Sequence, residues 1–489
     1  MTPTPHANLE QGERLRQFFL EAGYTEENMK GGLQMDALPS KLLGNLPRLL
    51  DQTSEPSRIH TLLRLFFIGV GVEPGSAEDT LGADGLELLR ETSLVVEQNS
   101  KLLGTALLAP FEDIVVAADH FSTIVSFQDP QAVLWPNPTT RQLDRFRIRR
   151  HWGSVLDLGT GSGTLALRMA AQADRLTGTD LNPRAIEFAR FNASVYGCGE
   201  IEWFTGDSFQ PVEGRTFDLI ISNPPFFVTP SADLLYCQNP GELDGFCRQV
   251  IQTAPNYLNE GGFLQIMFEW VEIEGQPWQE RLQSWLQGLE CDVWILKGYS
   301  DEVSRYTQSR LREMMESCDE ADFSRWIEYY RSRRVRHIHG GVLALRKRSG
   351  RNWVWIEEKR LPANEPFGEA VLNEFLVRDF LRSDGDEARL EESRLRLSPA
   401  VKLMQEWGPG PEGWQQGPMK LQVMGGLPCQ YPVDPAVVKF LNGLTGARPL
   451  REVVDELLPK VQASPEQVRR ECMEVTRRLL ERGFLLLEA

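Results

Sequence analysis

The order of apolar and polar positions predicts three regions along the chain. From residue 13 to about residue 121, apolar residues recur with the period of a helix in "ERLRQFFLEAG" and "SRIHTLLRLFFIG", and short strands follow. From about residue 129 to residue 349, apolar strands alternate with amphipathic helices, which is typical of an open α/β sheet with right-handed crossovers. Beyond residue 349 the pattern is less periodic until three capped helices and a strand follow.

The middle region contains seven apolar segments that we expect to be strands, and helical stretches fall between most of them. These segments are residues 154–159, 175–180, 201–207, 217–223, 261–268, 291–298 and 339–348. Strands that alternate with helices in this way build one layered sheet. The pattern therefore predicts an α/β fold with a seven-stranded sheet.

The regions on either side of the predicted sheet have the pattern of smaller α+β modules. Helices followed by a β-hairpin, with its turn at Asn99-Ser100, predict a winged-helix-like module in residues 1–121. The Pro- and Gly-rich residues 406–418 predict a turn-rich linker or a β-rich region. Three helices and a strand from about residue 430 predict a second winged-helix-like module. The expected domains are residues 1–121, 122–349 and 350–489.

Length and charge narrow the class of protein. A chain of 489 residues exceeds what one hydrophobic core supports, so several domains are expected. The net charge of −17 excludes a protein that coats nucleic acid by charge alone, because phosphate contacts need Lys and Arg. Two basic stretches, residues 141–150 and 331–348, flank the predicted sheet. They could meet a phosphate backbone or an acidic partner, or they could be solvated faces, and both interpretations stay open.

Cysteine usage and apolar runs indicate the compartment. The 7 cysteines are scattered and form no C-x-x-C pair, so neither a disulfide framework nor a zinc site is expected. The most apolar run, residues 62–72, is about half as long as a membrane span and contains Arg64. The first residues lack the pattern of a signal peptide. We expect a cytoplasmic protein with no metal and no membrane segment.

A glycine-rich turn follows the first strand of the predicted sheet. In "VLDLGTGSGTLALRMA", Gly159, Gly161 and Gly163 lie between a strand and a helix, where glycine allows a tight turn and close approach of a ligand. Asp157 precedes the glycines, and its carboxylate would repel the pyrophosphate of a dinucleotide but suits a cationic ligand. S-adenosylmethionine carries a sulfonium and an amino group, and it has no phosphate.

Acidic residues also end the next two strands. Asp180 lies about twenty residues beyond the glycine turn, where a carboxylate can accept both ribose hydroxyls of a nucleoside. Asp207 ends the third strand, where an adenine amino group would lie. A glycine turn alone is often only structural, but three acidic strand ends in this order favour a nucleoside-containing cofactor.

These motifs resemble a known family. "DLGTGSG", "GTDLNPRAIEFARFNA", "GDSF" and "FDLIISNPPF" are similar to class I S-adenosylmethionine-dependent methyltransferases, in the "methyltransferase small domain" branch with the HemK/PrmC-type glutamine and RsmC-type ribosomal RNA guanine methyltransferases. The resemblance covers roughly residues 110–348 and implies a Rossmann-like methyltransferase sheet that binds S-adenosylmethionine. It implies these cofactor-binding residues: Asp157, Gly159, Thr160, Gly161, Gly163, Asp180, Leu181, Asp207, Ser208, Asn223, Thr139 and Thr140.

The segment "NPPF" after the fourth strand is the candidate catalytic motif. An amide or aromatic amine nitrogen is a poor nucleophile because its lone pair is delocalised. The Asn223 side-chain oxygen and the Pro224 carbonyl can accept its two N–H bonds, Pro225 stiffens the loop, and Phe226 offers a face for stacking. The alternative is a proline turn that only ends a strand.

The sequence therefore predicts a methyltransferase that acts on a planar amino nitrogen of a macromolecule. The expected partner is ribosomal or transfer RNA or a translation-factor protein, so that either a nucleobase or a glutamine side chain receives the methyl group. A second hypothesis is a catalytically silent module that binds S-adenosylmethionine or nucleic acid. A third is a dinucleotide-dependent oxidoreductase.

Overall fold

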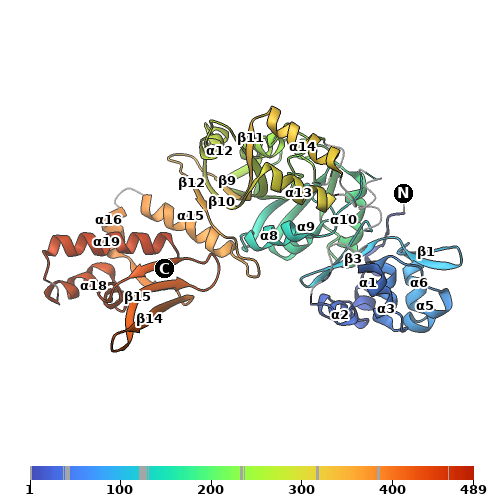
Figure 1. Cartoon of the computed structure of the whole chain (residues 1–489), viewed down its shortest axis with the longest axis horizontal. Helices are drawn as coiled ribbons and strands as arrows, with labels where there is room; N and C mark the ends of the chain where they lie inside the picture. The colour runs from blue at the N-terminus through green and yellow to red at the C-terminus, as the bar shows by residue number, and fades with distance from the viewer. Residues whose placement is uncertain are drawn as a thin grey trace. The chain divides into compact units, whose positions relative to one another are not determined.

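The computed structural model describes residues 3–36, 38, 45–120, 129, 131–231, 235, 237–314, 319–382, 386–460 and 462–488. The chain forms two compact units: Met1–Asp144 with Arg150–Arg360, and Arg145–Arg149 with Leu361–Ala489. Figure 1 shows the course of the chain from blue to red. In the described part of the chain, no helix has both the length and the apolar character needed to cross a bilayer.

The N-terminal elements are helices followed by two β-hairpins. The helices are α1 (Leu9–Glu21), α2 (Glu26–Gly32), α3 (Leu46–Gln52), α4 (Arg58–Leu62), α5 (Pro74–Leu81) and α6 (Ala83–Glu91). The hairpins pair β1 (Val95–Gln98) with β2 (Lys101–Gly104) and β3 (Leu107–Phe111) with β4 (Ile114–Ala118). Asn99 and Ser100 form the first turn, both with positive φ. The predicted helix of residues 57–69 begins as α4 and continues as a π-helix, Leu63–Ile68, up to Gly69.

The N-terminal elements share their hydrophobic core with helix α10 (Pro183–Val195) of the α/β part. Phe188, Phe191 and Val195 of α10 lie in one buried cluster with side chains of α1, α6 and the hairpins. The Asn192 amide also accepts from Ala117 N and donates to Ala117 O, both at 2.9 Å, as a neighbouring strand would. The N-terminal elements and the α/β part are therefore one packed body.

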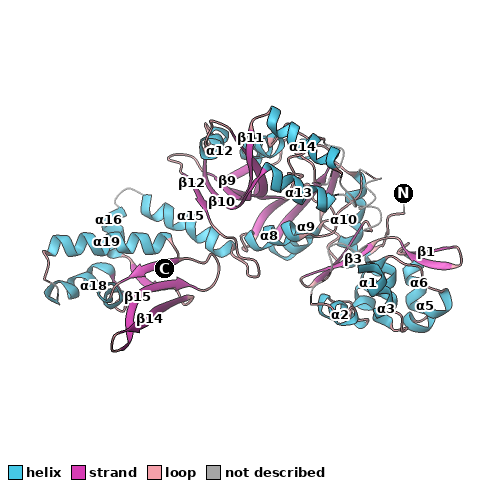
Figure 2. Cartoon of the chain, viewed as in Figure 1, coloured by secondary structure: helices cyan, strands magenta, loops and turns pink. Residues whose placement is uncertain are grey.

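An eight-stranded sheet is the centre of the first unit (Figure 2). Its strands are β5 (Trp152–Leu158), β6 (Ala173–Asp180), β7 (Glu202–Thr205), β8 (Phe217–Ser222), β9 (Leu258–Ile273), β10 (Cys291–Glu302), β11 (Val335–Lys347) and β12 (Val354–Glu358). They lie in the order β12-β10-β11-β9-β8-β5-β6-β7, and only β11 runs antiparallel to its neighbours. All seven predicted strands are present, but the prediction of seven strands was one too few. The additional strand β12 is a half-exposed edge strand, so it lacks the apolar run of a buried strand.

Helices cover both faces of the sheet. They are α8 (Pro138–Phe146), α9 (Thr164–Met169), α10, α11 (Gly245–Thr253), α12 (Trp278–Leu286), α13 (Val303–Met314) and α14 (Glu320–Ser332), with short 3-10 turns at Ala170–Gln172, Gln210–Val212 and Ala254–Tyr257. Ile266 and Phe268 of β9 pack with α11 and α12, whereas Val271 packs with α13 and α14. Odd and even positions of a strand point to opposite faces, so the sheet is buried from both sides.

The strand order reverses between β5 and β8. From β5 the chain continues to β6 and β7 on one side, and it then returns to β8 and β9 on the other side. Strands β5 and β8 run parallel and pair directly, with Leu158 opposite Ser222. In open α/β sheets ligands bind beyond the carboxyl ends of the strands at such a reversal. The glycine turn after β5 and the "NPPF" segment after β8 are therefore adjacent at the predicted binding edge.

The second unit combines helices with two small sheets. Its elements are α15 (Gly368–Arg382), α16 (Asp386–Glu392), β13 (Arg394–Leu397), β14 (Val401–Gly410), β15 (Gly413–Val423), β16 (Gln430–Val433), α17 (Pro435–Leu441), β17 (Thr445–Pro449), α18 (Leu450–Leu457), the 3-10 turn Leu458–Lys460, α19 (Pro465–Glu481) and β18 (Leu485–Leu487). The Pro- and Gly-rich residues 406–418 form the end of a β-hairpin, so the β-rich alternative is the one observed. The three predicted helices and the strand after Gly483 are present. The winged-helix likeness of both modules, and domain boundaries at residues 121 and 349, stay predictions.

The last two residues of α8 and the three residues that follow belong to this second unit. Phe367 N donates to Arg145 O at 2.8 Å, and the rings of Phe146 and Phe367 lie 5.6 Å apart. A Cβ on Gly368 would lie 1.8 Å from Arg147 O, so the start of α15 packs directly on this backbone. Residues 145–149 are thus part of the second unit although residues of the first unit flank them on both sides.

Candidate active site

The glycine turn after β5 has the conformation that its sequence predicts. Gly159, Gly161 and Gly163 have φ of 72°, 54° and 81°, which disfavour any residue with a Cβ. A Cβ on Gly159 or Gly161 would meet nothing within 4 Å, whereas a Cβ on Gly163 would lie 3.0 Å from the Ala189 side chain. The first two glycines therefore leave the backbone open to a ligand, and the third lets α9 pack closely on α10.

Asp157 lies beneath this turn, at the end of β5. Its side chain is 1% exposed, and its Oδ2 accepts from Thr160 Oγ1 at 2.6 Å and from Ala166 N at 3.0 Å. Burial raises the pKa of the Asp157 carboxyl to about 7, although both hydrogen bonds favour the charged form. A cationic group in the pocket would stabilise the carboxylate, which fits the predicted role.

The next two strands place their acidic ends at the same pocket. Asp180 Oδ2 accepts from Gly161 N at 2.8 Å, and its Oδ1 accepts from Asn182 N at 2.9 Å. Removal from water raises the pKa of the Asp180 carboxyl. Asp207 and Ser208 follow β7 and line the pocket, as does the exposed side chain of Leu181. The acidic strand ends predicted from spacing therefore lie around one cavity.

Asn223 is held by the threonines that begin α8. Its Nδ2 donates to Thr139 Oγ1 and Thr140 Oγ1, each at 3.3 Å. Its Oδ1 is buried and has no hydrogen-bond partner among the described residues. A buried carbonyl oxygen without a donor is costly, so this atom is an acceptor available to a donor that enters the pocket. The residue before Asn223, Ser222, donates from its Oγ to Leu158 O at 2.7 Å and so links the end of β8 to the end of β5.

Of the other residues of the "NPPF" segment, the two prolines line the pocket and Phe226 lies in the hydrophobic core. Pro224 and Pro225 line the pocket with Asn223. Phe226 is 5% exposed and packs in the buried cluster under α11, with its ring 5.4 Å from the Phe227 ring in an edge-on arrangement. It is not among the described lining residues, so stacking on a substrate stays a prediction that this side-chain position does not favour.

The pocket that these residues share has a volume of about 430 Å³. Two further walls complete the pocket. One is residues 132–137, and its end from Trp135 belongs to the segment "WPNPTTRQL", which resembles the segment that closes over the cofactor in related methyltransferases. The other wall includes Leu235, Gln238 and Phe246 and was not predicted as part of the site. This second wall carries no charged motif, so the sequence offered only the turn signal "NPG" at residues 239–241 as a hint of a loop.

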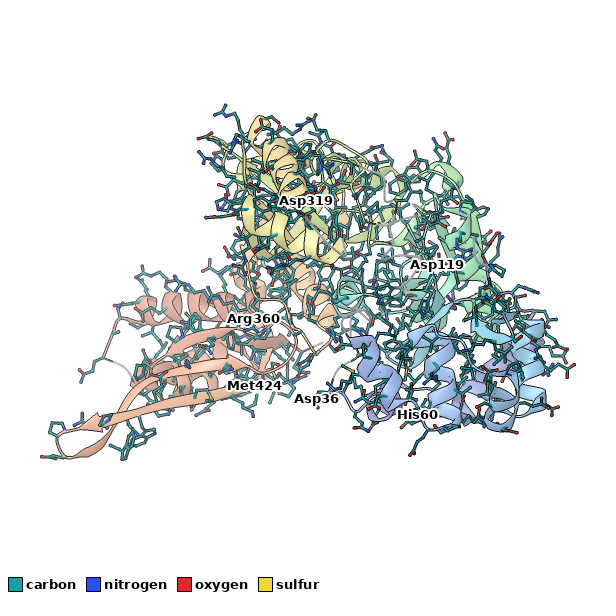
Figure 3. The ribbon with its side chains drawn as sticks, turned by 45° about the vertical axis from the view of Figure 1, so that its right-hand side comes forward. Asp36, His60, Asp119, Asp319, Arg360 and Met424 are labelled. Atoms are coloured by element: carbon teal, nitrogen blue, oxygen red, sulfur yellow. The ribbon has the colours of Figure 1, made fainter. Side chains whose placement is uncertain are left out.

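The first of these walls is anchored to α10 and to the N-terminal elements. Asp119, labelled in Figure 3, donates its N–H to Val133 O at 3.0 Å and accepts from Val133 N at 2.8 Å. The same carboxylate accepts from Arg184 Nε at 2.9 Å, and this ion pair is almost fully buried. The wall is therefore fixed by a buried charge pair rather than by loop contacts alone.

The donors and acceptors of the pocket fit S-adenosylmethionine. The volume suits a nucleoside with an amino acid side arm. Asp157 and Asp180 offer carboxylates to a cation and to hydroxyl groups, and none of the described lining residues is Lys, Arg or His. A pyrophosphate would find no cation there. Within the described residues, no cluster of three or more His, Cys, Asp or Glu side chains could hold a metal ion.

Two family models match the chain. Residues 141–288 match "Methyltransferase small domain", which includes the glycine turn, the acidic strand ends and the "NPPF" segment. Residues 373–487, in the second unit, match "Domain of unknown function (DUF7782)". The first match covers most of the residues that line the pocket, but not those before residue 141.

Curated relatives match the same part of the chain. A "Release factor glutamine methyltransferase" of Geobacter sulfurreducens is 36% identical over 152 residues, which are 28% of this chain and 52% of the relative. A "Putative protein N5-glutamine methyltransferase" of Methanocaldococcus jannaschii is 32% identical over 170 residues, which are 33% of this chain and 78% of the relative. The chain thus spans about half the length of the release factor methyltransferases that it matches.

Solved structures show weaker similarity. A methyltransferase from Pyrococcus furiosus aligns with a TM-score of 0.27 at 16% identity, over 43% of this chain and 83% of that chain. A tRNA m1G37 methyltransferase from M. jannaschii aligns with a TM-score of 0.30 at 12% identity, over 51% of this chain and 61% of that chain. Because the M. jannaschii relative of 32% identity is matched over 78% of its length, and because residues 141–288 match the family model, the chain belongs to the methyltransferase small domain family.

Proposed function

We propose that this protein is an S-adenosylmethionine-dependent N-methyltransferase that modifies the side-chain amide of a protein glutamine. The observation that carries the proposal is the buried, unpartnered Asn223 Oδ1 at the edge of the cofactor pocket. A primary amide nitrogen has two N–H bonds, and one of them would supply the missing donor. The names of the relatives support the same chemistry.

The cofactor-binding roles follow from the positions of the side chains. S-adenosylmethionine supplies a methyl group on a positively charged sulfur. Asp157 would hold the cationic end, Asp180 the ribose hydroxyls, and Asp207 with Ser208 the adenine, while the open glycine backbone allows close approach. Thr160, whose hydroxyl is engaged by Asp157, would contribute mainly through its backbone.

The catalytic role of the "NPPF" segment is to hold and polarise the substrate amide. Asn223 Oδ1 and the Pro224 carbonyl would each accept one N–H bond, which weakens delocalisation of the nitrogen lone pair and aims it at the methyl group. The Asn223 amide is held by Thr139 and Thr140 before the substrate arrives, so it would need little reorganisation during the reaction. Methyl transfer would form the N–C bond as the S–C bond breaks, with S-adenosylhomocysteine as the leaving group. Because neither acceptor is a strong base, the surplus N–H proton would pass to water.

Charge around the site supports a protein substrate over RNA. The arginines at 331, 333, 334, 336, 346 and 348 each lie within ion-pair distance of an acidic side chain, and Arg141 contacts Glu26 and Glu112. The basic stretch of residues 331–348 is therefore largely neutralised by neighbours, as is Arg141 at the start of the other stretch. A phosphate backbone gains affinity from uncompensated cations, which the pocket lining also lacks.

The proposal is tested with Asn223→Ala and methyl-labelled S-adenosylmethionine. We expect the affinity for S-adenosylhomocysteine, measured by calorimetry, to change less than threefold, and turnover to fall by about 10²–10³, as for loss of one preorganised polar group. Asn352→Ala is the control, because its amide donates to Arg348 O far along the chain from the pocket motifs. Unchanged turnover in Asn223→Ala would overturn the assignment.

The same methyl-labelled S-adenosylmethionine identifies the class of substrate, because the label marks the molecule that is methylated. Extract of a strain that lacks the protein is divided into protein and RNA fractions, and label is expected in protein and, after digestion, in N5-methylglutamine. Label in RNA would replace glutamine by a nucleobase as the target. Binding of S-adenosylhomocysteine without any transfer would indicate the silent module, and binding of NAD instead would indicate an oxidoreductase.

A further inference from the structure

The orientation of the Asn223 amide depends on a residue that does not touch it. Asn137 precedes α8, and its Oδ1 accepts from Thr140 N at 3.0 Å, as a helix N-cap does. The same oxygen also accepts from Thr139 Oγ1 at 2.7 Å and from Thr140 Oγ1 at 3.1 Å. A helix cap needs only the first of these three bonds.

The two hydroxyl bonds determine what the threonines can offer to Asn223. A carbonyl oxygen only accepts, so both hydroxyl protons must point at Asn137 Oδ1. Thr139 Oγ1 and Thr140 Oγ1 are left with lone pairs, and they can accept but not donate. Only the NH₂ end of the Asn223 amide can face them, as it does at 3.3 Å on both sides.

These hydrogen bonds, which run from Asn137 through Thr139 and Thr140 to Asn223 and are called the relay below, also fix the position of the unpartnered Asn223 Oδ1. If the amide turned by 180°, Asn223 Oδ1 would face two oxygens whose protons are already engaged, and both hydrogen bonds would be lost. The observed orientation therefore keeps Oδ1 away from the threonines as a free acceptor. We infer that Asn137 is a positioning residue for methyl transfer: through Thr139 and Thr140 it holds the Asn223 amide with its oxygen toward the substrate.

This inference rests on the proposed role of Asn223 and reassigns the two threonines. Sequence resemblance implies that they contact the cofactor. Thr140 does line the pocket, but Thr139 is not among its described lining residues. Each hydroxyl donates to Asn137 Oδ1 and accepts from Asn223 Nδ2, so the common function of the two threonines is to set the orientation of the Asn223 amide. Their contribution should therefore appear in turnover and not in cofactor affinity.

The test compares two double variants that leave the helix cap in place. Thr139→Val with Thr140→Val keeps the shape of both side chains and the bond from residue 140 N to Asn137 Oδ1, but it removes both hydroxyls. Thr139→Ser with Thr140→Ser restores the hydroxyls. We expect kcat to fall about tenfold in the valine pair, with the Kd of S-adenosylhomocysteine within twofold of wild type, and to recover most of its value in the serine pair.

Two further variants separate the relay from the cap. Asn137→Asp keeps an acceptor for all three donors, so it should retain most turnover, whereas Asn137→Ala should lose about as much kcat as the valine pair. Wild-type kcat in the valine pair would overturn the inference. So would a tenfold weaker Kd for S-adenosylhomocysteine with unchanged kcat, because the hydroxyls would then serve the cofactor.

A spectroscopic readout keeps the inference testable even if Asn223 proves not to be catalytic. The side-chain NH₂ signals of Asn223 can be assigned in full-length, asparagine-labelled protein by their loss in Asn223→Ala. We expect slow hydrogen exchange and slow rotation of this NH₂ group in wild type and the serine pair, and fast exchange in the valine pair. Identical exchange in all three proteins would overturn the relay, whatever the result for turnover.

Discussion

At the scale of single residues, Asp157 is a buried carboxyl group, and its proposed partner is the cationic end of the cofactor. The Asp157 carboxyl is buried beneath the glycine turn and shielded from water, and this burial raises its pKa to about 7. In the ligand-free protein the folded state then binds the proton more tightly than the unfolded chain. The free energy of unfolding should therefore decrease as pH rises from about 4 to about 7.

Cofactor binding should show the opposite trend. In the proposed role, the ionised form of Asp157 would attract the cationic end of S-adenosylmethionine, so affinity should increase as pH rises through about 7. Between pH 6 and pH 8 we expect the Kd to fall about tenfold, since the ionised fraction rises by about that factor. Calorimetry on Asp157→Asn should show weaker binding without this pH dependence. An equal pH dependence in the variant would assign the titration to another group.

The residues of the pocket differ in how well the sequence could place them. Asp157, Asp180, Asp207 and Asn223 lie at strand ends, and parallel strands of one sheet bring their carboxyl ends to one edge, so their proximity followed from order alone. Phe226 could not be placed in that way. An aromatic side chain after two prolines can point into a pocket or under a helix, and only the packing of α11 selects the core.

At the scale of elements, strand β9 and helix α13 are joined by a buried charge. Glu269 is 0% exposed, and its carboxylate accepts from Tyr306 at 2.6 Å and pairs with Arg310 at 2.8 Å. Tyr306 also accepts from Val228 N at 3.1 Å, just after the "NPPF" segment. The position of the chain just after the "NPPF" segment thus depends on this hydrogen-bond network.

Two arginines of α13 give a matched test of this network. Arg310→Met leaves the Glu269 carboxylate buried without its cation, which should lower the free energy of unfolding by about 3–5 kcal/mol. Arg305 pairs with Asp301 on the surface, so Arg305→Met should cost only about 0–1 kcal/mol. Urea unfolding measures both. Equal losses would show that burial of Glu269 does not determine the stability of this region.

Elements with a strong apolar period were predicted well, and those without it were not. The six predicted strands other than the exposed edge strand β7, and the helices α17, α18 and α19, are where the pattern places them, because burial imposes the pattern. Strand β12 and hairpin β14–β15 are largely exposed, so no alternation marks them. Their strand conformation comes from pairing with neighbours, which a local pattern does not contain.

At the scale of the whole molecule, the N-terminal elements and the α/β part should unfold together. Helix α1 crosses α10 so closely that a Cβ on Gly12 would lie 2.1 Å from Ser194 O. Backbone atoms cannot move aside cheaply, so any side chain at this position pushes the helices apart. The sequence could show that α1 is amphipathic, but not that its partner lies about 180 residues later.

Gly12→Ala should therefore lower the free energy of unfolding by about 1–3 kcal/mol, as overpacking does. Gly31→Ala is the control, because a Cβ at that exposed helix position would meet nothing within 4 Å, and it should be neutral or stabilise by up to about 1 kcal/mol. Thermal unfolding with S-adenosylhomocysteine present provides the measurement. If the ligand-stabilised transition is unaffected by Gly12→Ala, the two parts unfold independently.

The second unit is built from two separate segments of the chain, because it includes the five residues 145–149. The chain enters this unit at residue 145, leaves it at residue 150, and enters it again at residue 361. A domain appended behind a single linker can be lost or exchanged between genes by one cut. Here a gene shortened at codon 360 would leave Phe146, at the end of α8, without the Phe367 ring. Removal of the second unit by a single cut would therefore leave residues 145–149 behind without the contacts that they make in that unit.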